Sequence, residues 1–223
     1  MLLAQGTFSQ SVSVTGAKLL TMPEYVLPPE AVAAGIDGQV AVIVWVNKDG
    51  SVDRAEAYAG PYWPCGSNPK REIENVRDGV VETMKRAKFA PELKDGKPQN
   101  AEMLMTVLIG EAYKHAKEMR AAKDKSKVNW TEPTGGEVIN GKAVSLPKPE
   151  YPTVAQVNRI FGTVEIQVLI DENGKVLQAG VKTGNPKLQM AARDAACKAT
   201  FSTTLFNGKP VKVSGIIVYN FAP

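Results

Sequence analysis

The chain of 223 residues is 43% apolar and 22% charged, which is the composition of an ordinary soluble globular protein. This length suits one large or two small domains. No run approaches the roughly 20 apolar residues that a membrane-spanning helix needs, so the sequence predicts no membrane span in this chain.

The net charge of +4 is concentrated in one short stretch. Residues 113–127 hold six basic and two acidic side chains, which accounts for the whole excess. No interleaved aromatic residues provide a stacking surface for bases, so we expect no nucleic-acid partner. We predict a basic helical connector followed by a Gly/Pro break at residues 111–136.

Residues 1–22 are expected to form an N-terminal arm. The first five residues, Met1 to Gln5, are similar to the end of a secretory signal sequence. We therefore expect a periplasmic or otherwise exported protein whose signal region has been cleaved or truncated.

A sequence repeat links the two halves of the chain. Gly38–Val46 aligns without a gap with Gly162–Ile170, and in both segments every second residue is a valine or an isoleucine. A period of two with one branched face predicts a strand that places this face on a core. Each segment is followed by an Asp-Gly or Asn-Gly turn, which is typical of a hairpin.

The same order of features continues in both halves. Asn68 and Asn185 each precede a proline, and we expect each to cap the start of a helix. Each helix ends in an Ala-x-Phe sequence, before a Gly-Lys-Pro turn and a closing apolar strand. This pattern predicts an α+β protein with two tandem modules, residues 23–110 and 137–223. Each module should hold a small antiparallel three-stranded sheet packed against helices.

Residues 61–67 are an insertion in the first half and contain two aromatic side chains. The insertion either packs as a flap over the apolar outer face around Trp45, which we favour, or forms a contact surface for a partner. Cys65 and Cys197 either bridge the two halves in an oxidising compartment or remain as one loop thiol and one buried helical thiol. Two cysteines make no metal-site spacing, and we expect no metal.

No arrangement of residues indicates catalysis. The single histidine, His115, lies in the basic connector, where we expect a solvated side chain. Gly-x-Ser-x-Gly and phosphate-loop sequences do not occur. We therefore expect a binding module without a cofactor, and not an enzyme.

Together these features resemble the TonB C-terminal domain family. The second half carries a pattern of Tyr-Pro, Gly-x-Val, hairpin, helix, Phe, Gly-Lys-Pro and closing apolar strand. The residues that carry this motif are Tyr151, Pro152, Gly162, Phe201, Gly208 and Pro210. The first half is a looser copy, and the resemblance covers roughly residues 23–109 and 143–221.

The resemblance implies a periplasmic module of the energy-transducing transport machinery. Such a module binds the TonB box, a short extended peptide of outer-membrane transporters, by strand addition. By this analogy the docking edge is the exposed final strand, formed by Val213, Ser214, Gly215, Ile216, Ile217, Val218 and Tyr219. Gly215 interrupts the row of side chains and is expected to mark a bulge or a close backbone approach.

Two functions of different classes follow from this reasoning. In the first, the protein binds an extended segment of an envelope partner through a free strand edge. In the second, it is a structural or assembly protein of the cell envelope whose modules pair their own edges, in a homodimer or within one chain. A free edge favours the first function and a hidden edge favours the second.

Overall fold

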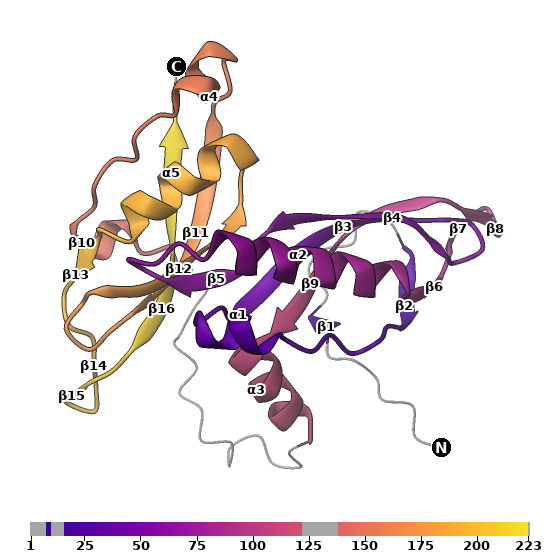
Figure 1. The fold of residues 1–223 in the computed structure, drawn as a ribbon, viewed down its shortest axis with the longest axis horizontal. Helices are drawn as coiled ribbons and strands as arrows, with labels where there is room; N and C mark the ends of the chain where they lie inside the picture. The colour runs from indigo at the N-terminus through magenta and orange to yellow at the C-terminus, as the bar shows by residue number, and fades with distance from the viewer. Residues whose placement is uncertain (1–7, 10–15, 122–137, 223) are drawn as a thin grey trace. The chain divides into compact units, whose positions relative to one another are not determined.

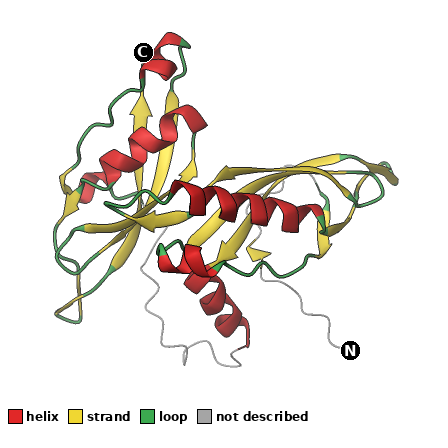
Figure 2. Ribbon diagram, in the orientation of Figure 1, coloured by secondary structure: helices red, strands yellow, loops and turns green. Residues whose placement is uncertain are grey.

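The chain divides into two compact units in the computed structural model, which describes residues 8–9, 16–121 and 138–222. The first unit comprises Met1–Pro61 and Pro69–Val128, and the second comprises Tyr62–Asn68 and Asn129–Pro223. Each contains antiparallel sheets and helices (Figures 1 and 2), which confirms the predicted α+β class. Residues 62–68 thus belong to the second unit, although they lie inside the range 23–110 that the sequence predicts as one module.

The first unit is built on a four-stranded sheet in the order β1-β9-β3-β4. Its strands are β1 (Phe8–Ser9), β3 (Gly38–Val46), β4 (Val52–Ala59) and β9 (Ala101–Ile109). Helix α2 (Lys70–Lys85) lies along this sheet and contacts β4 and β3 (Figure 1). The remaining elements are α1 (Pro29–Ala33), α3 (Gly110–Ala121), and the strand pairs β2 (Lys18–Thr21) with β6 (Lys88–Ala90) and β7 (Glu92–Lys94) with β8 (Lys97–Gln99).

The second unit is built on a four-stranded sheet in the order β16-β11-β12-β5. Its strands are β5 (Tyr62–Pro64), β11 (Gly162–Ile170), β12 (Val176–Thr183) and β16 (Val213–Phe221). Helix α5 (Pro186–Ala196) packs across β11, β12 and β16. The remaining elements are η2 (Asn140–Lys142), α4 (Thr153–Val157), and the strand pairs β10 (Ala143–Ser145) with β13 (Thr200–Phe201) and β14 (Leu205–Phe206) with β15 (Lys209–Pro210).

The repeat explains why the central strand of each sheet forms. β3 and β11 have the same bounds as the two aligned segments of the sequence. The four branched residues of β11 (Val164, Ile166, Val168 and Ile170) are at most 2% exposed. Burying such a side chain contributes about 1.5–3 kcal/mol each, so the alternating face fixes which side of the strand meets the helix.

The two long helices begin differently, and one predicted cap is wrong. The Asn185 side chain accepts a hydrogen bond from the Lys187 backbone N–H, so Asn185 caps α5 as expected. Helix α2 instead begins after Pro69, which occupies the N-cap position without a side-chain hydrogen bond. Asn68 belongs to the second unit and not to the helix start, because it ends the segment 62–68 that contains the strand β5.

Each main sheet has one strand more than the predicted three. β1 is added beside β9, and β5 is added beside β12. The order of short helix, hairpin, long helix and closing strand is shared by the two units, as α1-β3-β4-α2-β9 and α4-β11-β12-α5-β16. That the two units are a tandem pair of one type of module stays a prediction.

Part of the insertion at residues 61–67, which we expected to be a flap over Trp45, is a strand of the second unit. Tyr62–Pro64 form β5 and pair with β12 instead. The indole of Trp45 lies under the Arg54 guanidinium, 4.5 Å from the ring centroid, and its Nε1 donates to Glu102 at 3.0 Å. Charged side chains of the same sheet therefore cover the indole that we expected a flap to protect.

Helix α3 forms the beginning of the predicted connector. The rest of that connector, residues 122–136, lies outside the described residues, as does the Met1–Gln5 segment expected to belong to a signal region. Within the arm, β1 pairs with β9 and β2 pairs with β6.

The β11–β12 hairpin requires glycine at position 174. Gly174 has φ +83°, and a methyl group on it would overlap the Phe201 carbonyl. Its own carbonyl accepts a hydrogen bond from the Phe201 N–H at 2.8 Å. The turn and the chain segment after α5 therefore touch through their backbones, and a side chain between them cannot be accommodated without movement.

We predict that Gly174→Ala destabilises the protein more than Gly208→Ala does. Gly208 also has a positive φ, +75°, but has open space around it. The left-handed conformation alone costs roughly 1–2 kcal/mol for alanine. Displacing the Phe201 backbone should cost about 1–3 kcal/mol more through the lost hydrogen bond. Urea denaturation followed by circular dichroism measures both free energies of unfolding, and equal losses would contradict the backbone-contact explanation.

Candidate functional site

The predicted docking strand, β16, lies at one side of the second sheet. Its ladder with β11 runs in continuous register from the pair Gly162–Phe221 to the pair Ile170–Val213. The bulge considered at Gly215 is therefore not formed. On its other side no strand among the described residues joins the sheet, and half of the backbone groups of β16 point away from β11.

Most side chains of this strand are buried, contrary to the expectation of an exposed strand. Gly215, Ile216, Ile217 and Tyr219 are buried, while Val213, Ser214 and Val218 are half-buried. Burial raises the pKa of Tyr219 to about 12. A partner would therefore contact β16 through its outer backbone groups and not through its buried side chains.

A short segment of the same chain lies against this edge. Val138 forms a parallel bridge with Ile216, and the Ile139 N–H donates to the Ile216 carbonyl at 2.9 Å. The Asn140 carboxamide makes hydrogen bonds with both backbone groups of Val218. It accepts from the Val218 N–H at 2.8 Å and donates to the Val218 carbonyl at 2.6 Å. We call Val138–Asn140 the edge strap.

The strap leaves the edge as soon as it has made these contacts. The chain turns in the 3-10 helix η2 at Asn140–Lys142 and continues as β10, which pairs with β13. The strap therefore covers the positions of Ile216 and Val218 by two different means, backbone pairing at the first and a side-chain amide at the second.

Glycine at position 215 makes room for the strap. A Cβ atom on Gly215 would lie 2.7 Å from Cδ1 and 2.8 Å from Cγ2 of Ile139. The close approach expected at Gly215 thus exists, but it is made by a side chain of the strap and not by another backbone. Ile139 is 9% exposed, so it completes the core at this edge.

The Tyr-Pro residues of the motif hold the entry to β11. The Tyr151 hydroxyl donates to the Ile160 carbonyl at 2.6 Å, and its ring packs edge-on against Phe221 with 5.5 Å between centroids. Pro152 is the N-cap residue of α4, and Gly162 begins β11 with φ +129°. These contacts fix where β11 begins beside the end of β16.

The other motif residues form turns and core. Phe201 is 8% exposed and lies in β13. Gly208 and Pro210 belong to the β14–β15 hairpin, where Gly208 has a positive φ. The motif therefore specifies the fold of the unit, whereas no motif residue belongs to the outer edge of β16.

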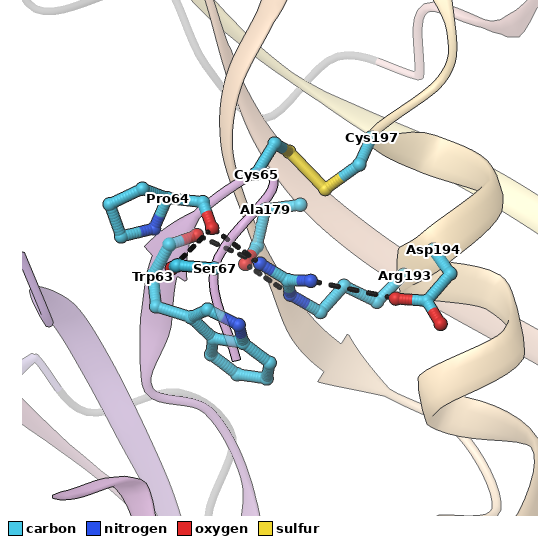
Figure 3. Close-up of polar contacts among 8 residues, drawn as sticks. All are labelled: Trp63, Pro64, Cys65, Ser67, Ala179, Arg193, Asp194 and Cys197. Atoms are coloured by element: carbon cyan, nitrogen blue, oxygen red, sulfur yellow. Dashed lines mark hydrogen bonds and ion pairs between the residues drawn. A yellow bond between two sulfur atoms is a disulfide. The ribbon is translucent and has the colours of Figure 1, made fainter. Parts of the chain in front are cut away.

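The opposite side of the sheet is closed by β5. Tyr62–Pro64 pair antiparallel with β12 at Gly180–Gln178, and Gly180 leaves space that the Tyr62 ring fills. Cys65, directly after β5, forms a disulfide with Cys197 at the end of α5 (Figure 3). The structure thus adopts the bridged alternative of the two that the sequence left open.

A buried arginine binds β5 from the helix side. Figure 3 shows Arg193 of α5 directed at backbone carbonyls of β5 and β12. Its guanidinium donates to Trp63 at 3.0 Å, Pro64 at 3.1 Å and Ala179 at 3.2 Å. It also lies 3.8 Å from the Trp63 ring centroid, in cation–π geometry.

Arg193 keeps its charge although it is only 3% exposed. Burial lowers its pKa to about 10, which still leaves the guanidinium protonated at neutral pH. An ion pair with Asp194 at 3.6 Å opposes this effect of burial. A buried charge is tolerated only with such partners, so β5, Arg193 and the disulfide form one mutually dependent group.

Sequence reasoning missed both Arg193 and the edge strap. Arg193 follows Ala192 on the alanine-rich helix, and nothing local distinguishes it from a surface arginine. Val138–Asn140 has no periodic pattern that assigns it to an edge. The paired cysteines were the only available signal that residues 62–68 approach the end of α5.

The described residues contain no group of three or more His, Cys, Asp or Glu side chains placed to hold a metal ion. Among the helices of the described part, none is long and apolar enough to cross a membrane. Helix α3 contains His115, whose side chain lies outside the described parts.

Comparison with protein families adds an independent finding for the second unit. Residues 147–223 match the family described as Gram-negative bacterial TonB protein C-terminal. No curated protein matches the chain. The match begins after the edge strap and covers α4, the strands β11, β12 and β16, and α5. The resemblance seen in the sequence is thereby confirmed for this segment, which is similar to a module that interacts with envelope proteins.

We predict that reduction of the Cys65–Cys197 disulfide destabilises the second unit by about 2–5 kcal/mol. The bridge closes a loop with a sequence separation of 132 residues, and its loss frees the unfolded chain. Urea denaturation with and without reductant measures the effect. The double variant Cys65→Ser/Cys197→Ser should match the reduced protein and ignore reductant. An unchanged stability on reduction would contradict the role assigned to the bridge.

Proposed function

We propose that the second unit binds an extended segment of another cell-envelope protein by adding it as a strand along β16. The observation that carries this proposal is the outer edge of β16, where Ile216 and Val218 direct backbone groups away from β11. Polar backbone groups at a buried edge need partners, and an extended peptide supplies them in register. Binding, and not catalysis, is the activity that this edge offers.

The family match supports the class of partner. Residues 147–223 are similar to a domain of Gram-negative bacterial TonB proteins, which work at the cell envelope. The periplasm is the compartment in which the Cys65–Cys197 disulfide would persist. The N-terminal segment of an outer-membrane transporter is accordingly the partner that we propose to test first.

A second function is favoured by the way in which the chain covers β12 and β16 with its own segments. β5 covers the free side of β12, and the edge strap covers the middle of β16. A structural or assembly protein of the envelope, whose modules close their own edges, would have this property. Such a protein would bind no transporter peptide, and its β16 amides would stay protected under all peptide concentrations.

We predict that Val218→Pro abolishes peptide binding while Val218→Thr does not. The Val218 N–H points outward to Asn140 and not to β11, so proline at this position spares the inner ladder. It removes the donor that an added strand needs. Threonine keeps that donor and the branched shape of the side chain.

The measurement is an amide-shift NMR titration of the full chain with synthetic peptides from transporter N-termini. Saturable shifts along β16 in the wild type and in Val218→Thr, but not in Val218→Pro, are the expected result. Equal shifts in Val218→Pro would place the binding site elsewhere, and circular dichroism checks that this variant is folded.

A further inference from the structure

The strap also contacts β16 through a side chain at Gly215. Gly215 is the third residue of the strand and has no side chain to cover the core at that point. The side chain of Ile139 takes this place, with Cδ1, Cγ2 and Cγ1 at 2.7, 2.8 and 3.0 Å from where a Cβ on Gly215 would be. We call this place the Gly215 notch.

The notch is apolar and is filled from outside the sheet. Its occupant, Ile139, is 9% exposed, and the neighbouring strand residue Ile217 is fully buried. Among the described residues, the three atoms nearest to a Cβ on Gly215 all belong to Ile139. Whatever pairs with the edge of β16 must therefore also provide an apolar side chain here.

The strap is an incomplete substitute for a strand. Within the described residues, the Ile139 N–H donates to the Ile216 carbonyl, and the Asn140 carboxamide then satisfies the backbone groups of Val218. A carboxamide offers the same donor and acceptor pair as a peptide unit, so Asn140 imitates the next step of a ladder. The chain then turns away, and its pairing with β16 ends.

We infer that the Gly215 notch is a binding subsite for a β-branched aliphatic side chain, valine or isoleucine, of an added strand, and that the edge strap occupies this subsite until the partner displaces it. This inference rests on the proposed function, because it concerns the same edge. It adds the side-chain class that the edge selects and a competitor that lies within the chain itself.

The strap and an incoming strand compete for the same groups of β16. An incoming strand needs the Ile216 carbonyl, both backbone groups of Val218 and the notch, and the strap holds all of them. The apparent affinity of a partner therefore falls by the fraction of molecules in which the strap is open. Weakening the strap without touching β16 should raise that affinity.

The first test uses Asn140→Ala in the full chain, with Asn158→Ala as its matched control. Asn158 is an exposed asparagine whose amide donates only locally, to the Val154 carbonyl at 2.7 Å. Asn140→Ala removes both bonds to Val218, and we expect it to speed exchange of the Val218 amide about tenfold and to tighten peptide binding about tenfold. The control should change neither.

The second test examines the notch itself. Gly215→Ala places a methyl group where Ile139 lies, so it should expel the strap and yet weaken binding of a peptide that carries isoleucine at this position. A matched peptide with serine in place of that isoleucine should bind the wild type about tenfold more weakly or not at all. If Gly215→Ala does not fold, Ile139→Ala empties the notch while β16 stays unchanged, and it should strengthen binding of the isoleucine peptide.

The outcomes separate this inference from the proposed function. Peptide binding that is equal in the wild type and in Asn140→Ala, with faster Val218 exchange in the variant, would overturn the competition and leave strand addition intact. Binding that is indifferent to the isoleucine-to-serine change would overturn the subsite. Failure of every peptide to bind even Asn140→Ala would instead overturn the proposed function. In that case a synthetic peptide of residues 138–145, added to Asn140→Ala, still tests the notch, and its failure to bind would overturn the subsite as well.

Discussion

The unpaired backbone groups at the two edges of the second sheet are the constraint on which the rest of this unit depends. Strand edges that are left open invite uncontrolled pairing, and proteins cover them in specific ways. Here the outer side of β12 pairs with β5, which the Cys65–Cys197 disulfide ties to the end of α5, whereas the described residues Val138–Asn140 bond the outer side of β16 through a backbone amide and a side-chain amide. The first contact is held by a covalent bond, whereas the second is made by hydrogen bonds and side-chain packing.

The difference in strength between the two closures suggests a division of roles. Arg193 donates to three carbonyls on β5 and β12, and separating β5 would leave its charge buried without partners. The strap on β16 involves no buried charge, so its release exposes only neutral groups that water or a peptide can satisfy. Both β12 and β16 lie inside the segment that matches the TonB C-terminal family, whereas β5 and the edge strap lie outside it. The weaker covering of β16 is the reason that we propose this strand, and not β12, as the site of recognition.

The sequence predicted the elements with strong periodic signals and missed those without them. The alternating valines fixed β3 and β11 to the residue, and Asn185 was recognised as a cap because its proline and helix follow directly. Asn68 also precedes a proline, but it lies in a segment whose structure depends on pairing with β12, which is distant in the sequence. Arg193 and Asn140 owe their roles to partners 130 and 78 residues away, and no local pattern can indicate such contacts.

We propose that Val138–Asn140 cover the docking edge of β16 and are displaced when a partner binds. The most direct measurement is the through-hydrogen-bond scalar coupling between the Val218 amide nitrogen and the Asn140 side-chain carbonyl carbon, recorded in the full-length protein. The account predicts that this coupling is present in the free protein and disappears as a transporter-derived peptide saturates β16. Its absence from the free protein, or its persistence at saturation, would contradict the account.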